Sequence, residues 1–508
     1  MNIRKISTSA YISSSPAFAM TPSGPVLVWG GDFLHVTSLE GKALPGWPRK
    51  GNRFFASSPS IGDVDGDGIP EIFCGNDDDC LYGWRLDGSP LPGFPIKTGG
   101  DVFSAPALYD LDGDGKLEII FGSDDGNVYV VKHTGRIVGG WPRSTGHFVA
   151  SSPCVGDING NGKPEIVIGS WDRKLYAWDT CGELLPGWPV ELGHIVWSSP
   201  VLADIDGDGL PEVIVTSDQL YVIRSDGSFV EGFPRKTRSW MVSTPCVADV
   251  DGDGQLEIGV GSEKFYVFRS DGTLAPGYPI DLDGYVWASP IAVDIDACGS
   301  LEWIVGSWSG TIYVIGHDGK IRSPLNIRTS GPVFSSCAAM QAADRIVISC
   351  GSWDKSMYLA ELKSRQKVQM PCPMFRGNPE RVGQAAILKG TGGKPEETAV
   401  ITPPSDIASQ GKLHLGKVLL LPESPVPREI IYVDLQVGDP DTVQKAMLVY
   451  NIDGVVHPSP MVLHRGVLRG MIHPLQPGTT CSWHLEISSW DNTSVRLPES
   501  SEYTIKIP

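Results

Sequence analysis

Acidic residues recur along the chain at one fixed spacing, Asp-x-Asp/Asn-x-Asp/Asn-Gly-x-x-Glu. Alternate side chains of a tight loop point inward, and Ca²⁺ takes about six to eight oxygen ligands at ~2.3–2.6 Å, so the spacing predicts a calcium shell. The well-formed copies are Asp63, Asp65, Asp67 and Glu71; Asp110, Asp112, Asp114 and Glu118; Asp157, Asn159, Asn161 and Glu165; Asp204, Asp206, Asp208 and Glu212; and Asp249, Asp251, Asp253 and Glu257.

A sixth copy keeps Asp294, Asp296 and Glu302 but has Cys298 at its fifth position. An EF-hand would place its last Glu at position twelve between two helices, whereas these loops are flanked by strand-like segments. Asp-Gly and Asn-Gly also form ordinary hairpin turns, which would explain a single copy. Five copies in register favour calcium binding.

The net charge of the chain lies in these loops. The chain has 59 acidic and 41 basic residues; the five loops hold 18 carboxylates, and removing 18 from 59 leaves 41, which balances the bases. Carboxylates packed this closely repel one another unless a cation lies among them, which predicts a structural role for calcium. The acidic balance leaves no basic patch for phosphates and argues against a nucleic-acid partner.

The loops belong to eight repeats, which we number units one to eight. A Ser-Pro element or its variant marks each unit, near residues 16, 59, 106, 153, 200, 245, 290 and 337. Each unit reads as four short strands, the outermost being the proline-flanked segment exemplified by LPGWP. We therefore expect an all-β fold, with an eight-bladed β-propeller of four-stranded antiparallel blades over residues 1–388. Arg4–Ser7 aligns with the outer strands and is expected to complete the last blade.

The repeat ends before residue 395. A linker such as KGTGGKPEET follows, and then about seven apolar segments with partial alternation predict a β-sandwich over residues 395–508. Asn492 lies in a glycosylation-type triplet, which often arises by chance.

Two sets of aromatic residues recur at fixed places in the units. The first set is expected around the mouth of the ring on the face without calcium loops, where flat rings could bind a sugar or an apolar side chain: Phe103, Trp171, Trp197, Trp287, Trp308, Phe334 and Trp353. Packing between blades is the favoured interpretation for that set, with ligand binding as the alternative. Packing is also the interpretation for the second set, Trp47, Phe94, Trp141, Trp188, Phe233 and Tyr278.

Ten cysteines do not form an evident disulfide framework. Cys154, Cys246 and Cys337 occupy equivalent places in alternate units, too far apart to bond in a ring, and are expected to be small buried thiols. Cys74 and Cys80 flank a predicted hairpin and are the only pair placed so that a disulfide is feasible, although none is expected.

With these motifs in place, residues 10–385 resemble the FG-GAP and VCBS repeats of bacterial surface proteins and of the integrin α-subunit propeller. The resemblance implies calcium at the loop residues given above, ligands on the calcium-free face and an extracellular or cell-surface location. Position nine is Glu where many members have Asp, and units one and eight lack the loop. The segment PCPMFRGNPERVGQ resembles a tail that closes bacterial propellers, and the stretch from Pro477 resembles fibronectin-type or immunoglobulin-like domains.

No catalytic motif is found, and a non-enzymatic, calcium-stabilised binding or adhesion scaffold with a protein or glycan partner is the expected function. The alternatives are a polysaccharide-active enzyme of the lyase type, or a structural subunit or cargo of an exported assembly. No apolar stretch is long enough to span a membrane, and no signal peptide is visible at the amino terminus. A cytoplasmic location and non-classical export therefore both stay open.

Overall fold

The computed structural model describes residues 2–364 and 366–383, and in the remaining chain residues 415–421, 431–437, 443–452, 455–464, 467–472, 480–489, 494–498 and 503–506. The structure divides into two compact parts, Met1–Ile401 and Thr402–Pro508, which are described separately. The described residues are all-β: they hold no α-helix, and the one 3-10 turn is η1 (Ser323–Leu325). No helix among them is long and apolar enough to cross a membrane.

Met1–Ile401 contains eight antiparallel sheets of three or four strands, one for each repeat. Their strands are β2 (Ala17–Thr21), β3 (Gly24–Trp29) and β4 (His35–Ser38); β5 (Ser60–Gly62), β6 (Glu71–Asn76), β7 (Cys80–Trp84) and β8 (Ile96–Lys97); β9 (Ala107–Tyr109), β10 (Glu118–Gly122), β11 (Asn127–Val131) and β12 (Arg143–Ser144); β13 (Cys154–Gly156), β14 (Glu165–Gly169), β15 (Lys174–Trp178) and β16 (Val190–Glu191); β17 (Val201–Ala203), β18 (Glu212–Thr216) and β19 (Leu220–Ile223); β20 (Cys246–Ala248), β21 (Glu257–Gly261) and β22 (Phe265–Arg269); β23 (Ile291–Val293), β24 (Glu302–Gly306), β25 (Thr311–Gly316) and β26 (Ile327–Arg328); and β27 (Ala338–Ala342), β28 (Arg345–Ser352) and β29 (Ser356–Lys363), joined by β1 (Asn2–Ser7).

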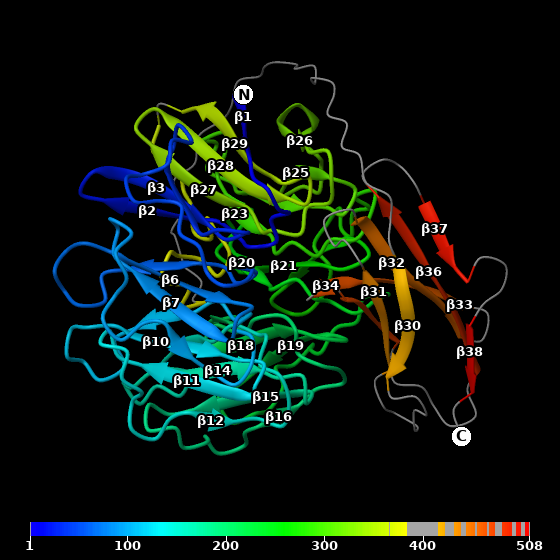
Figure 1. The fold of residues 1–508 in the computed structure, drawn as a ribbon, viewed down its shortest axis with the longest axis horizontal. Coiled ribbons are helices and arrows are strands. Elements are labelled where there is room, and N and C mark those ends of the chain that lie inside the picture. Colours follow the sequence, from blue (N-terminus) through cyan, green and yellow to red (C-terminus); the bar gives the residue numbers. More distant parts are fainter. Residues whose placement is uncertain are drawn as a thin grey trace. The chain divides into compact units, whose positions relative to one another are not determined.

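The amino-terminal strand completes the last sheet, as the sequence predicted. β1 pairs antiparallel with β29 from Asn2 opposite Glu361 to Ser7 opposite Ser356. In Figure 1 the sheets follow one another around a ring, from β2 and β3 in blue to β27, β28 and β29, which lie beside β1. Because β1 pairs with β29, the outer edge of β29 is not left open.

The proline-flanked segments are not the outermost strands, which corrects the sequence prediction. They form turns, and the short fourth strands begin after them, at Ile96, Arg143, Val190 and Ile327. Proline has no N–H to donate to a ladder, so pairing starts beyond it. The aromatic residues of these segments are buried as predicted, and Trp47 and Trp188 donate their indole N–H groups to the Leu86 and Ser225 carbonyls of the following unit.

Neighbouring sheets pack face to face through clusters that span two units. Trp303 of β24 is fully buried against Gly259 of β21, where an added Cβ would lie 2.7 Å from the indole. A side chain at position 259 would therefore push the two sheets apart, and glycine lets the tryptophan fill the space. The second and third strands of the sheets are almost wholly buried in this way.

The segment 366–383 runs along the inner strands. Its carbonyl groups accept backbone N–H groups from Ile61 of β5, Leu108 of β9, Val155 of β13, Leu202 of β17, Ala292 of β23 and Ala339 of β27. Each donor lies in the innermost strand of its sheet, so this tail satisfies inner edges that would otherwise be unpaired.

Thr402–Pro508 forms two antiparallel sheets. Their strands are β30 (Leu415–Leu421), β31 (Ile431–Val437), β35 (Val467–Ile472) and β34 (Val462–His464) in one, and β33 (Val455–Pro460), β32 (Val443–Ile452), β36 (Thr480–Ser489) and β37 (Ser494–Leu497), with β38 (Tyr503–Lys506) on β36, in the other. The sheets approach closely where Gly470 of β35 faces Leu448 of β32. β33 and β37 were not expected from the sequence, and the linker 389–398 and Asn492 lie outside the described residues.

The cysteines of the described residues are free thiols. Cys74 and Cys80, the only feasible pair in the sequence, do not bond, because Cys74 lies opposite Tyr82 and Cys80 lies opposite Asn76 in the ladder. Cys154, Cys246 and Cys337 are buried, as predicted.

Candidate metal loops and the aromatic mouth

The acidic loops join the first and second strands of units two to seven. In unit two, one oxygen of Asp63 accepts the N–H groups of Gly66 and Asp67 at 2.8 and 3.1 Å, and the other accepts that of Gly68 at 2.8 Å. Gly66 and Gly68 have φ angles of 80° and 86°, which L-residues rarely adopt. The first aspartate thus holds the loop in shape while the other carboxylates converge.

The glutamate at position nine begins the second strand and folds back over the loop. Its Oε2 accepts the backbone N–H of the second loop residue at 2.9–3.1 Å in all six loops, through Glu71, Glu118, Glu165, Glu212, Glu257 and Glu302. The hydrogen bond fixes one oxygen and leaves the other to face the aspartates.

The side chains of the loops converge as a metal shell requires. Carboxylate oxygens lie within 4.8 Å of one another in the groups Asp63, Asp65 and Glu71; Asp110, Asp112 and Glu118; Asp204, Asp206 and Asp208; and Asp249, Asp251 and Glu257. In unit four, Asn159 and Asn161 turn their amides toward Oε1 of Glu165 at 2.8 and 3.4 Å. Asp67, Asp114, Asp157 and Asp253 complete the five loops at the predicted positions.

Burial raises the pKa of the loop glutamates. Burial, together with the smaller effect of the neighbouring aspartates, raises the pKa of Glu71, Glu212 and Glu257 to about 7, although the backbone hydrogen bond opposes the shift. For Glu302, burial raises the pKa to about 8. Such groups resist ionisation unless positive charge is supplied, which is what a bound cation does.

Unit three shows that its loop accepts a cation. The Lys132 ammonium lies 2.9 Å from Asp112, 3.7 Å from Asp114 and 3.6 Å from Glu118. The ammonium stands in for a metal ion at the convergence point of the loop. In unit five the guanidinium of Arg224 pairs with Asp206 at 2.9 Å in a related way. The residues therefore fit a hard cation held by oxygen.

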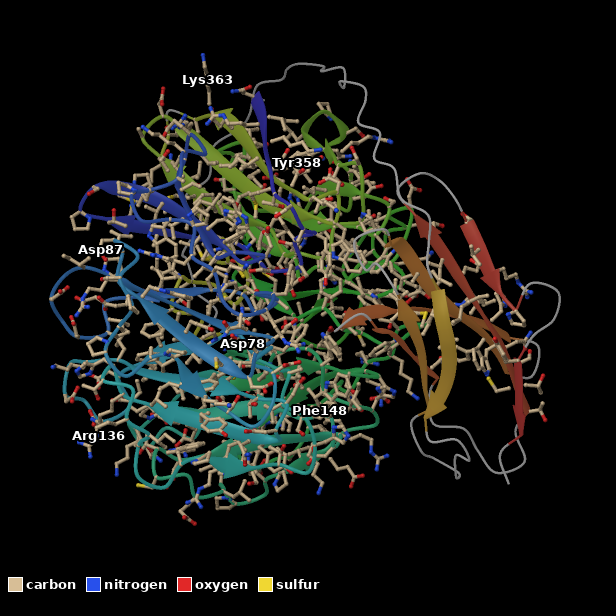
Figure 2. All side chains as sticks on the ribbon, viewed as in Figure 1. Asp78, Asp87, Arg136, Phe148, Tyr358 and Lys363 are labelled. Carbon is tan, nitrogen blue, oxygen red and sulfur yellow. The ribbon has the colours of Figure 1, made fainter. Side chains whose placement is uncertain are left out.

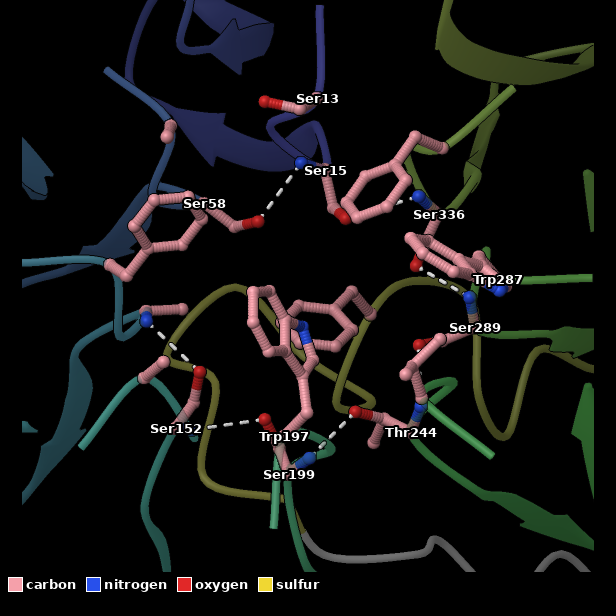
Figure 3. A pocket seen from close by; sticks show the side chains of 17 residues that line it. Ser13, Ser15, Ser58, Ser152, Trp197, Ser199, Thr244, Trp287, Ser289 and Ser336 are labelled. Atoms are coloured by element: carbon pink, nitrogen blue, oxygen red, sulfur yellow. Dashed lines mark hydrogen bonds between the residues drawn. The ribbon is translucent and has the colours of Figure 1, made fainter. Parts of the chain in front are cut away.

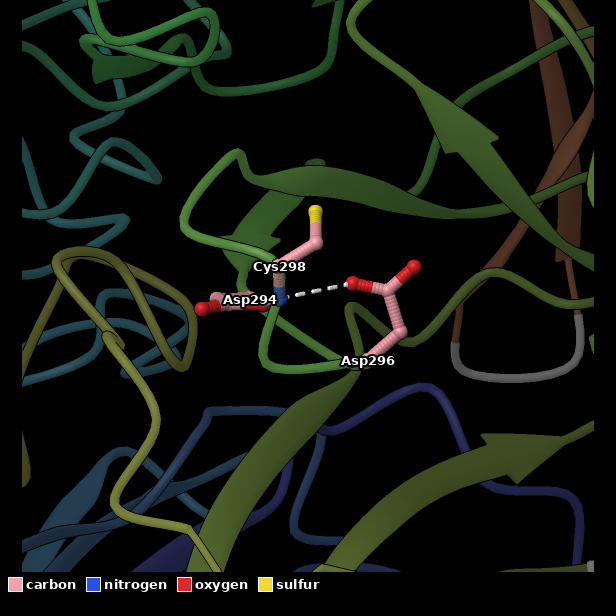
Figure 4. A group of neighbouring side chains, drawn as sticks. All are labelled: Asp294, Asp296 and Cys298. Carbon is pink, nitrogen blue, oxygen red and sulfur yellow. Dashed lines mark hydrogen bonds between the residues drawn. The ribbon is translucent and has the colours of Figure 1, made fainter. Parts of the chain in front are cut away.

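Unit seven keeps the loop shape with altered ligands (Figure 4). The backbone N–H of Cys298 donates to Asp294 and Asp296, both at 3.1 Å, as Asp67 does in unit two. Ala297 takes the place of the first loop glycine at a φ of 60°. A thiol replaces one carboxylate among the three grouped side chains, so this loop offers calcium a poorer shell than the other five.

Units one and eight, which lack the loop, are adjacent in the ring. A short turn joins β2 to β3, and another joins β27 to β28. A groove of about 540 Å³ lies at this gap, lined among others by Met20, Met340, Met370 and Met374. The row of acidic loops is therefore interrupted at one place, where methionines line the groove together with Asp63 and Glu380.

The predicted aromatic residues gather at the opposite ends of the inner strands, in two groups. Trp197 contacts Phe103 and Trp171, with centroids 6.3 and 5.1 Å apart. The second group joins Trp287 to Trp308 and Phe334 at 5.2 and 5.5 Å, and Trp353 contacts both of these at 5.4 and 6.1 Å.

Each group contains residues of two kinds. Phe103, Trp197, Trp287 and Phe334 line an axial cavity of about 90 Å³ (Figure 3). Trp171, Trp308 and Trp353 are buried behind them. The cavity-lining residues could contact a ligand, whereas the other three act mainly through packing.

Sequence reasoning missed a further aromatic column and the floor of the cavity. Tyr11, Phe54, Phe148, Trp240 and Tyr285 each stand five residues before the Ser-Pro proline or its equivalent, and Tyr11 contacts Phe54 and Trp353. This column was visible in the repeat alignment. Phe375, which lines the cavity from the tail, lies outside the repeats and left no such signal.

Six carboxylates lie on the same face as the aromatic mouth. They sit at the turn between second and third strands and accept a hydrogen bond from a tyrosine hydroxyl: Asp78 from Tyr82, Asp125 from Tyr129, Asp172 from Tyr176, Asp218 from Tyr221, Glu263 from Tyr266 and Asp354 from Tyr358. Figure 2 shows Asp78 well inside the outer edge, where Asp87 and Arg136 lie.

A family model of the FG-GAP-like repeat matches the chain at residues 63–121, 110–168, 157–215 and 204–260. Each match begins at the first aspartate of a loop and runs into the second strand of the next unit. The sequence resemblance to FG-GAP repeats is thereby confirmed for these four stretches, within a β-propeller fold.

Solved structures with a similar fold share little sequence with the chain. The N-terminal part of BBS1 in complex with ARL6, soaked with lead, has a TM-score of 0.44 at 11% identity, covering 66% of this chain and 98% of that one. The Dos1 propeller has a TM-score of 0.48 at 10% identity, covering 76% and 96%. The V. cholerae biofilm matrix protein Bap1 has a TM-score of 0.38 at 14% identity, covering 89% and 72%. No curated protein sequence matches the chain.

Proposed function

We propose that this chain is a non-enzymatic binding or adhesion scaffold, stabilised by calcium, that recognises a protein or glycan ligand at its aromatic mouth. In this proposal the eight sheets are the blades of one eight-bladed propeller. Thr402–Pro508 is an immunoglobulin-like or fibronectin-type sandwich that acts as a spacer or second contact. FG-GAP-like repeats in the propeller are consistent with a scaffold of this kind.

Calcium is the proposed ion because the shell is made of hard oxygen donors. The five complete loops offer carboxylate, amide and backbone oxygens, and in unit three a cation already lies among them as the Lys132 ammonium. Bound calcium would neutralise the aspartates and hold the glutamates ionised. Its role is to join the first two strands of each sheet firmly, and no reaction is assigned to it.

The observation that carries the ligand proposal is the concentration of aromatic side chains on one face. Phe103, Trp197 and Phe334 remain partly exposed although they line the axial cavity, while the acidic loops lie at the other end of the sheets. Flat, amphipathic rings with nearby hydrogen-bonding groups suit the faces of sugars and the apolar side chains of proteins. An extracellular or cell-surface location is proposed with it, since weak sites of this type fill only at about 10⁻⁴ to 10⁻³ M calcium.

The proposal is tested by measuring the binding of the full chain, in millimolar calcium, to a glycan array and to a panel of extracellular matrix proteins. We expect at least one saturable ligand, bound about tenfold or more weakly by Trp197→Ala and Trp287→Ala. Phe229→Ala is the matched control, because Phe229 is an exposed aromatic outside the mouth. Equal binding by all three variants would contradict the location of the site. Turnover of uronate polymers would instead favour the polysaccharide-active enzyme.

A further inference from the structure

The axial cavity is ringed by hydroxyl groups supplied by seven of the eight units (Figure 3). Each unit contributes the residue at one equivalent position, just before its innermost strand. Unit three has Ala105 there, and the other units have a serine or threonine. The hydroxyl residues are Ser15, Ser58, Ser152, Ser199, Thr244, Ser289 and Ser336.

Every one of these hydroxyl oxygens accepts a backbone N–H from the preceding unit, at 2.9–3.1 Å. A hydroxyl that accepts one hydrogen bond still has its own proton to donate. Within the described part of the chain, none of the seven donates that proton to a protein acceptor. Seven O–H donors without acceptors therefore surround one cavity of about 90 Å³.

The floor of the cavity belongs to a tail segment that carries two buried guanidinium groups. Phe375 lines the cavity, and the Arg381 guanidinium lies 5.2 Å from the centre of its ring. Arg381 is fully buried and donates to the carbonyl oxygens of Pro59, Phe375, Ser15 and Pro16.

Arg376, next to Phe375 in the chain, is in a different situation. Only 3% of its surface is exposed, and its Nε and both Nη atoms have no hydrogen-bond partner in the described residues. Burial lowers the pKa of both arginines to about 9, and no carboxylate in the described residues offsets this. Two positive charges are thus buried in the tail segment that supplies Phe375 to the cavity, without a carboxylate counter-charge among the described residues, which is costly in a low-dielectric interior.

We propose that the axial cavity binds a small monovalent anion, of the size of chloride, bromide or formate, held by the ring hydroxyls and attracted by Arg376 and Arg381. Water would accept from the hydroxyls but would leave the buried charge uncompensated, whereas an anion does both. The volume of about 90 Å³ restricts the site to small ions, and the six carboxylates on the same face repel a polyanion more strongly than an ion of single charge. This site goes beyond the proposed scaffold function and does not depend on it.

Bromide is a direct probe because it scatters anomalously and resembles chloride in size. The calcium-loaded full chain is crystallised from bromide, and its melting temperature is measured in sodium bromide and in sodium gluconate at equal ionic strength, gluconate being too large for the cavity. We expect an anomalous peak on the axis within hydrogen-bond distance of the ring hydroxyls, and a saturable rise in melting temperature with bromide alone. Water on the axis, or equal melting in both salts, would overturn the proposal.

Two variants separate an anion effect from a structural one. Arg376→Met should abolish the bromide-dependent rise and melt no lower than the parent in gluconate, since it removes an uncompensated charge. Arg136→Met, at an exposed arginine, should behave as the parent. Thr244→Val keeps the side-chain shape and removes one donor, and should weaken bromide binding about fivefold. An undiminished bromide response in both Arg376→Met and Thr244→Val would also contradict the site.

Discussion

The backbone N–H of Ser336 donates to Oγ of Ser15 at 3.1 Å, although 321 residues separate them in the sequence. The same bond links the other successive units except units two and three, where Ala105 offers no acceptor, and this one joins the last unit to the first. It closes the ring on the inside, as the pairing of β1 with β29 closes it on the outside.

Ser15→Ala should destabilise the protein because it leaves the buried N–H of Ser336 without its acceptor, at a cost of about 1–3 kcal/mol. Ala105 offers the matched reverse change, since it interrupts the ring beside Ser58. Ala105→Ser should be neutral or stabilising by up to about 1 kcal/mol. Denaturant unfolding in calcium measures both, and a stabilising Ser15→Ala would contradict the role of the ring.

Chelation should lower the melting temperature markedly, and added calcium should restore it. A site filled at about a hundred times its Kd adds ~2.7 kcal/mol, and five sites multiply the effect. Calorimetric titration should give about five calcium ions per chain, with Cys298→Asp adding a sixth by completing the loop of unit seven. A melting curve indifferent to chelator, with no metal by elemental analysis, would refute calcium binding.

Asp67→Asn should have opposite effects with and without calcium. The amide oxygen can still accept the N–H of Ile69, as Asn161 accepts that of Lys163, so the loop keeps its shape. One lost charge should weaken calcium binding at this loop about tenfold, or ~1.4 kcal/mol, while relieved repulsion raises the metal-free melting temperature. Asp87→Asn is the control, because Asp87 makes a similar turn contact away from any metal loop. Matching behaviour of the two variants would rule out a ligand role for Asp67.

Lys132→Met should raise the calcium affinity of unit three several-fold. The ion must displace the Lys132 ammonium from Asp112, Asp114 and Glu118, and the variant removes that competitor. The metal-free protein should lose stability, since the ammonium now offsets the carboxylates. Lys97→Met, in the outer strand β8, should change neither quantity when titrated by calorimetry.

The metal-free protein should lose stability as pH rises from about 4.5 to about 8. The folded pKa of Glu71, Glu212 and Glu257 is about 7, above the usual value near 4.5, so the protonated form is favoured in the folded state. Their contribution is complete below about 4.5 and is lost as pH passes 7. Melting in chelator across this range should show the fall, and calcium should remove it by holding the glutamates ionised. Parallel curves with and without calcium would show that these carboxylates do not meet the ion.

The loops and repeats were readable from sequence because their chemistry is local. The aspartates and glycines of one loop lie within nine residues, and their backbone hydrogen bonds follow from that spacing. The closing strand was predicted too, because Arg4–Ser7 matched a repeat position. The fourth strands were predicted at the proline-flanked segments, but prolines have no N–H to donate to a neighbouring strand. These strands therefore begin after the second proline, and the predicted position was wrong by a few residues.

What the sequence could not show depends on contacts across the ring. The ion pair of Lys132 with Asp112 joins a residue just after β11 to an acidic loop 20 residues earlier, and the ring of hydroxyl acceptors joins residues of neighbouring units. Arg376 and Phe375 lie in a tail without a repeat partner, so no column of the alignment marked them. Their surroundings appear only once the tail lies along the inner strands.

The pairing of β1 with β29 sets an order of assembly during synthesis. β1 is synthesised before the other strands of the ring, and its partner residues 356–361 are added with the last of these strands. The other seven sheets can therefore form before β1 has a partner strand. A nascent chain stopped before residue 356 would leave β1 unpaired. The ring would be complete only when β1 pairs with β29.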